Sequence, residues 1–309
     1  MKIRKSAILL AAVLLAAAVL MTACVTNNKI NEAMQDRDVK QVTAYVKEYS
    51  EKDKQEKFDP VVTAAAKKLL QKQKPDNFAF VESLIAKTRD YGVSSQLEKT
   101  LTAAADKLLQ EKTLKNYEFV DSLITQTKDE KIAAALEKTL LSAAEDLAKE
   151  KDYDNFELLD SLIRSTKNKE LKKDLTALED KYAENKISGF LAGKWQRIRA
   201  SEYANGMVIK VTWTNHKGTG RIVDVSKIGS DRFQWAVNDV KWKNVQAIDR
   251  KRFQFKEMWK YDDGYGTVTP EYVEGTTGEI NYKKKIIKTH SPQSGSIDQT
   301  RDTYWEKIE

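Results

Sequence analysis

The chain repeats itself at a spacing of 39 residues between about Val39 and Tyr182. Two short motifs share this spacing: Asn77-Phe78, Asn116-Tyr117 and Asn155-Phe156, and Ser83-Leu84-Ile85, Ser122-Leu123-Ile124 and Ser161-Leu162-Ile163. A repeat of this kind is one small supersecondary unit, which buries its apolar faces only by stacking on its neighbours. The spacing therefore predicts four stacked units over residues 38–186.

Each repeat contains two apolar stripes at helical spacing. The first stripe recurs at i, i+3, i+6 and i+7, as in Phe78, Val81, Leu84 and Ile85. The second recurs at i, i+4, i+7 and i+11, as in Leu97, Leu101, Ala104 and Leu108. Both spacings follow one face of a 3.6-residue helix, so each unit is predicted to be a helical hairpin and the array an α-solenoid. An up-and-down helical bundle is the alternative, and the fixed period favours the solenoid.

Polar residues mark where the repeats begin and where the array ends. Three asparagines stand just before the first apolar residue of a unit: Asn77, Asn116 and Asn155. An asparagine side chain at that position accepts a backbone N–H, which predicts that these residues are helix N-caps. In the fourth unit, Glu179 replaces Leu140 and Tyr182 replaces Ala143. This polar substitution predicts a terminal cap.

From Gly189 onward the composition and the periodicity change together. Eleven of the twelve glycines and all six tryptophans lie in this part of the chain. Apolar residues now alternate with polar ones, as in Met207, Ile209, Val211 and Trp213, and glycine-bearing turns separate the runs. About eight strands in some 120 residues predict an antiparallel up-and-down barrel over residues 187–309, because closure removes exposed strand edges. The predicted class is thus a multidomain α+β protein.

The N-terminus carries the parts of an export signal. Three positive charges precede an apolar run from Ala7 to Leu20, which predicts a signal peptide over residues 1–23. The following sequence, Met21-Thr22-Ala23-Cys24, resembles the lipobox of bacterial lipoproteins, and this resemblance implies that Cys24 is lipidated and becomes the first residue of the mature chain. An ordinary signal peptide is the alternative. Residues 24–37 are then a tether, and Val25 after the cysteine favours the outer over the inner membrane.

A short motif at the start of the barrel adds a second resemblance. Gly193-Lys194-Trp195 is similar to the Gly-x-Trp opening of lipocalins and related calycin barrels. The resemblance implies that Gly193 and Trp195 close one end of the barrel and that Arg301, or else Lys307, packs across that tryptophan. It also implies an apolar small ligand inside. Trp213, Trp235, Trp242 and Trp259 are either core residues or the lining of such a site, with Trp213, Trp235 and Trp259 as the ligand-binding candidates.

The residue types needed for catalysis are scarce. The only histidines, His216 and His290, stand beside turns, and Cys24 is the only cysteine, so neither a catalytic residue nor a metal ligand set is predicted, and no cofactor. From Phe190 onward, 21 basic residues face 15 acidic ones, but they are interleaved and match no nucleic-acid signature.

These observations predict a non-enzymatic lipoprotein, anchored in the cell envelope through Cys24, whose solenoid binds a protein partner. The alternative is a carrier of an apolar small molecule or lipid in the barrel. No nucleic-acid partner is expected.

Overall fold

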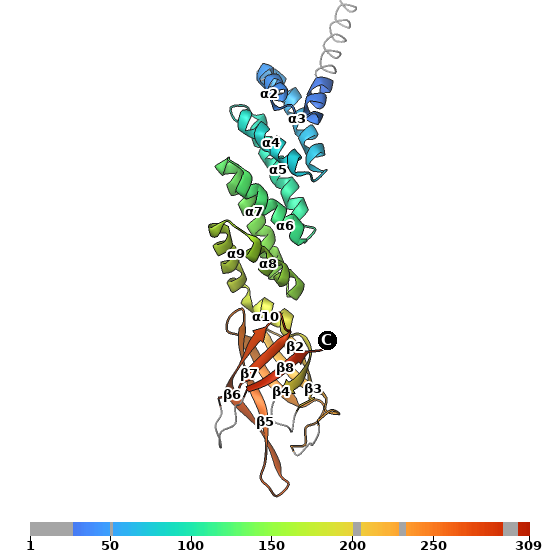
Figure 1. Ribbon diagram of the computed structural model, residues 1–309, viewed down its shortest axis with the longest axis vertical. Coiled ribbons are helices and arrows are strands. Elements are labelled where there is room, and N and C mark those ends of the chain that lie inside the picture. The colour runs from blue at the N-terminus through green and yellow to red at the C-terminus, as the bar shows by residue number, and fades with distance from the viewer. Residues whose placement is uncertain (1–26, 50–51, 200–204, 229–232, 293–301) are drawn as a thin grey trace, which may run out of the picture. The chain divides into compact units, whose positions relative to one another are not determined.

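The computed structural model describes residues 27–49, 52–199, 205–228, 233–292 and 302–309. The chain divides into two compact parts, one up to Ala143 and one from Ala144 onward. Helices make up the N-terminal region and a closed antiparallel barrel forms the C-terminal one, which confirms the predicted α+β class at this level (Figure 1).

The first part consists of helices. Their bounds are α2 (Val39–Glu48), α3 (Lys52–Leu70), α4 (Pro75–Lys87), α5 (Val93–Leu109), α6 (Leu114–Gln126) and the greater part of α7 (Glu130–Lys149). Helix α2 contacts α4, and α3 contacts α5. The predicted stripes supply the core, with Phe78 and Leu97 fully buried, whereas Ala105 is buried in place of Ala104. Residues 27–35, inside the predicted tether, are helical, and Met34 there is buried.

The conserved spacing of the asparagines has a different cause from the predicted one. Asn77 is the third residue of α4, after the N-cap position Lys74, and its side-chain amide donates to the Leu69 carbonyl at 2.7 Å. Asn116 likewise donates to the Leu108 carbonyl at 2.8 Å. The prediction that these residues are N-caps was therefore wrong. Each of these carbonyls, near the end of the preceding helix, also accepts a backbone N–H, from Lys72 at 3.1 Å or Glu111 at 3.2 Å, so the amide adds a second hydrogen bond that ties the two helices together.

Replacing Asn77 by alanine is expected to destabilise the helical region by about 0.5–1.5 kcal/mol, because the Leu69 carbonyl loses its side-chain donor and keeps only the Lys72 N–H. Urea unfolding followed by far-ultraviolet circular dichroism measures the change. Asp76→Ala, on the neighbouring exposed position, is the control. Equal stability of the two variants would contradict the assigned role.

The second part contains the remaining helices and the barrel. The helices are α8 (Tyr153–Ser165), α9 (Lys169–Lys181) and α10 (Ala183–Leu191). The strands are β1 (Gly193–Arg199), β2 (Val208–Thr214), β3 (Lys217–Asp224), β4 (Val240–Ala247), β5 (Arg252–Asp262), β6 (Val268–Asn281), β7 (Ile286–His290) and β8 (Asp302–Lys307). Each strand pairs antiparallel with the next, and β8 pairs with β1, so the predicted up-and-down barrel is confirmed. Helix α10 runs across the predicted boundary between residues 186 and 187.

Glu179 is not a solvent-facing end of the helical array. The residue is 1% exposed, and its carboxylate contacts the Lys186 ammonium of α10 and the Arg250 guanidinium of the β4–β5 turn, the latter at 2.9 Å. Asp160 of α8 also reaches Lys186, at 2.9 Å. The predicted polar cap is corrected here: the carboxylate replaces a leucine because it joins α9 to α10 and to the barrel, where cations balance its burial.

Candidate functional site

Aromatic side chains fill the barrel at the end that α10 covers. Buried aromatic members of this core include Trp195, Trp242, Trp305, Phe253 and Phe255. Inward-facing glycines make room for them. A Cβ atom on Gly218 would lie 3.1 Å from the Trp213 ring, and one on Gly220 would lie 3.1 Å from the Trp242 Cβ. Pairing of small and bulky residues of this kind is how a narrow barrel interior is packed.

The residues predicted to close the barrel lie together at this end. Trp195 is fully buried, its indole N–H donates to the Leu191 carbonyl of α10 at 2.8 Å, and it pairs in register with Lys307. The Lys307 ammonium lies 5.6 Å from the centre of the Trp195 ring and donates to the Phe190 carbonyl. Gly193 has a φ of +116°, and a Cβ there would meet the Glu309 carbonyl. Arg301, the other basic candidate, lies outside the described residues.

A charged cluster, formed by Arg197, Lys241 and Glu257, lies inside the barrel against the aromatic core. Arg197 is 5% exposed, and the Lys241 and Glu257 side chains are each 2% exposed. The Lys241 ammonium lies 3.1 Å from a Glu257 carboxylate oxygen and also donates to the Met258 carbonyl. Burial lowers the pKa of Arg197, an effect that Glu257 opposes.

A β-bulge explains how Lys241 enters the interior. Gly220 pairs with Trp242 and Arg221 pairs with Val240, so Lys241 is an extra residue between two successive pairs. A bulge breaks the alternation of faces and re-aims a side chain. Lys241 and its neighbour Trp242 are therefore both buried.

Aromatic rings surround the cluster. The Lys241 ammonium lies 4.7 Å from the centre of the Trp235 ring and 5.4 Å from that of Trp259. The Arg197 guanidinium lies 5.9 Å from the Trp305 ring. Trp235 and Trp259, two of the ligand-binding candidates, are thus brought together around one cation. Trp213 is not with them, because it precedes the β2–β3 turn at the other end of the barrel.

Lys241 is expected to make barrel stability rise with pH. Burial lowers the pKa of Lys241 from 10.5 to about 8, although Glu257 opposes the shift. Between these two values the unfolded chain holds the proton and the folded chain does not, so a rise in pH favours folding. The free-energy cost of burying the Lys241 charge is fully present below pH 8, and it disappears as the pH approaches 10.5. From pH 7.5 to 9.5, we expect the free energy of unfolding to increase by about 2 kcal/mol.

Urea unfolding followed by tryptophan fluorescence measures this dependence in the barrel alone, because all six tryptophans lie there. Lys241→Met should remove the rise. Burial also lowers the pKa of Lys307, but that residue is present in both proteins and cancels in the difference. An unchanged slope in the variant would show that Lys241 titrates normally.

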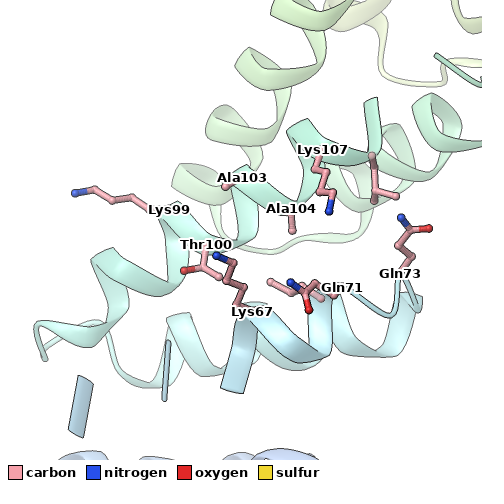
Figure 2. A pocket seen from close by; sticks show the side chains of 10 residues that line it. Lys67, Gln71, Gln73, Lys99, Thr100, Ala103, Ala104 and Lys107 are labelled. Carbon is pink, nitrogen blue, oxygen red and sulfur yellow. The ribbon is translucent and has the colours of Figure 1, made fainter. Parts of the chain in front are cut away.

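A separate groove lies in the first part, between α3 and α5. It has a volume of about 660 Å³, with Leu70 and Leu108 among its apolar lining. Figure 2 shows Lys67 and Gln71 on the α3 wall and Lys107 extending toward them from α5. Lys99 of α5 completes a set of three lysines, none of which has an ion-pair partner within the described residues.

Part of the charged cluster carried a sequence signal. Arg197 lies two residues after Trp195, and Glu257 lies an even number of residues after Phe253 and Phe255. Because alternate residues of a strand face the same side, both charged residues are expected to face the barrel interior. Lys241 gave no such signal, because the bulge places it next to Trp242.

No protein-family model, curated protein or solved structure matches the chain. Within the described ranges, no helix is long and apolar enough to cross a membrane. The same residues contain no group of three or more His, Cys, Asp or Glu side chains arranged to hold a metal ion. Cys24, the predicted lipidation site, lies outside them.

Proposed function

We propose that the protein is a non-enzymatic lipoprotein of the bacterial cell envelope whose helical region is an α-solenoid that binds a protein partner. The groove between α3 and α5 carries this proposal. Three lysines without an ion-pair partner among the described residues, beside an apolar lining, offer both electrostatic steering and buried contact area. An acidic surface on the partner would complement them.

Two features support the solenoid. Helices α4, α6 and α8 each have 13 residues and begin at Pro75, Leu114 and Tyr153, which are 39 residues apart. The contacts of α2 with α4 and of α3 with α5 join helices of the same position in successive hairpins, as stacking requires.

Cross-linking in intact cells, followed by purification of the protein, tests the partner surface. Changing Lys67, Lys99 and Lys107 together to glutamate should abolish recovery of the cross-linked partner, because the charge complementarity is inverted. The matched control changes three exposed lysines of α9, Lys169, Lys172 and Lys173, to glutamate. Equal recovery with both triple variants would refute the groove as the binding surface.

The anchor is tested separately. We propose that lipidated Cys24 attaches the protein to the envelope, to the outer membrane rather than the inner one. Each buried acyl CH₂ contributes about 0.8 kcal/mol, so several chains hold the protein permanently. Cys24→Ser should move the protein from the detergent phase to the aqueous phase in a partition assay. Retention of the variant in the detergent phase would exclude the lipid anchor.

The second candidate function is a carrier of a small molecule in the barrel, related in architecture to lipocalins. The observation that favours it is the cluster of Arg197, Lys241 and Glu257, because a barrel filled only for stability has no need of buried charges. Polar groups at a few points in an apolar enclosure are typical of a small-molecule site.

A further inference from the structure

The charged cluster does not balance its own charge. Arg197 and Lys241 are two cations, and Glu257 is the one carboxylate with which either is paired in the described part of the barrel. Asp239 pairs at 2.8 Å with Lys260, a third cation, which lies over the Trp235 ring as Lys241 does. Burying a cation without a counter-charge is costly, and among the described residues of the barrel one of the two cations has no carboxylate of its own.

The buried hydrogen-bonding groups around the cluster also favour a partner that accepts hydrogen bonds. Within the described residues, four buried N–H groups near the cluster have no acceptor: the Nε of Arg197 and the indole Nε1 of Trp242, Trp259 and Trp305. One buried acceptor, Glu257 Oε1, has no hydrogen-bond donor either, although the Lys241 ammonium lies 3.1 Å from it, so unpaired donors outnumber unpaired acceptors. Arginine and tryptophan side chains only donate hydrogen bonds. Buried polar groups are almost always paired in native proteins, so the missing partner is an acceptor.

These donors belong to one site. The Arg197 guanidinium lies over the Trp305 ring, and the Trp305 and Trp242 rings meet edge to face with centroids 5.0 Å apart. On the other side, the Lys241 ammonium lies over Trp259. The donors and the two cations thus form one group of neighbouring side chains on β1, β4, β5 and β8.

We infer that Arg197 and Lys241 bind the carboxylate of a small ligand inside the barrel. This inference rests on the proposed carrier function and adds the chemical class of the ligand. The planar guanidinium presents two parallel N–H groups that match a carboxylate, and the ammonium adds a point charge. The tryptophan rings cover the apolar remainder of the ligand.

Titration calorimetry of the full-length protein with three probes tests the inference. Octanoate should bind at least tenfold more tightly than 1-octanol, which has the same chain length and no charge. Acetate supplies the carboxylate without the apolar chain. In Arg197→Met, octanoate affinity should fall at least tenfold and octanol affinity should not fall. Arg252→Met, on the exposed end of β5, is the matched control and should leave both affinities unchanged.

The outcomes separate the carboxylate site from the carrier function. Equal affinities for octanoate and octanol would refute the carboxylate site but not the carrier function. The unpaired donors would then be bound to water. Binding of octanoate and acetate with equal affinity, without octanol, would support the site and refute an apolar carrier. Binding of no probe would overturn both.

A second variant decides the case in which Arg197→Met does not fold. Arg197→Lys retains the charge but loses the two parallel N–H groups. Octanoate affinity should then fall by about threefold to tenfold. Affinity equal to that of the unmodified protein would overturn the role assigned to the guanidinium.

Discussion

Glu257→Gln is expected to lower the free energy of unfolding of the barrel by about 3–5 kcal/mol. The substitution preserves the shape of the side chain and removes the one negative charge that faces Lys241 and Arg197 within the part of the barrel that the structure describes. Lys241 can release its proton in response, because its pKa is already about 8, whereas a guanidinium stays charged. The uncompensated Arg197 charge therefore dominates the loss.

Urea unfolding followed by tryptophan fluorescence measures this loss. Glu274→Gln is the matched control, since this carboxylate pairs with Lys256 on the barrel surface and is 67% exposed. Surface ion pairs contribute about 0–1 kcal/mol, so the control should differ little from the unmodified protein. Adding Arg197→Met to Glu257→Gln should restore stability, because it removes the surplus charge. A double variant no more stable than Glu257→Gln alone would refute the charge balance.

The barrel was predictable from the sequence because its signals are local. Ile209, Val211 and Trp213 alternate with Lys210, Thr212 and Thr214, and these three apolar side chains contribute to the core. Short strands joined by short turns usually pair with their neighbours in the sequence. Closing such a sheet into a barrel is one of the few arrangements that leave no strand edge exposed. Turn positions were harder to predict from glycine alone: Gly218 lies in β3 and pairs with Trp213, while Asn215 and His216, both with positive φ, form the β2–β3 turn.

Features that depend on contacts distant in sequence were not predictable. Glu179 appears polar at the end of a helical array, and only the fold brings Lys186 and Arg250 to it. Asn77 precedes an apolar stripe, as an N-cap does, yet its partner is a carbonyl of the preceding helix. In both cases the sequence identifies a polar residue at a special position, while the direction of its side chain is set by tertiary packing.

Gly278 also gave no signal in the sequence, although the interior depends on it. The residue lies directly opposite Phe253 across the β5–β6 pair and opposite Thr289 across the β6–β7 pair. A Cβ atom there would lie 2.1 Å from Cζ of the buried Phe253 ring. Glycine inside a strand often marks such a close approach.

Gly278→Ala is therefore expected to destabilise the barrel by about 3 kcal/mol, the upper end of the usual cost of overpacking. The strand is paired on both sides and cannot withdraw, so the Phe253 ring has to move within a filled core. Tryptophan-monitored urea unfolding gives the value. Thr277→Ala, on the exposed outer face of the same strand, should cost no more than about 1 kcal/mol.

A double-mutant cycle identifies the cause of that loss. Phe253→Leu alone removes buried contacts and destabilises the barrel, but in the Gly278→Ala protein it also removes the clash. The double variant should therefore be more stable than the sum of the single effects by about 1 kcal/mol or more. Strict additivity would mean that the alanine is accommodated by the strand and that Phe253 does not require glycine opposite it.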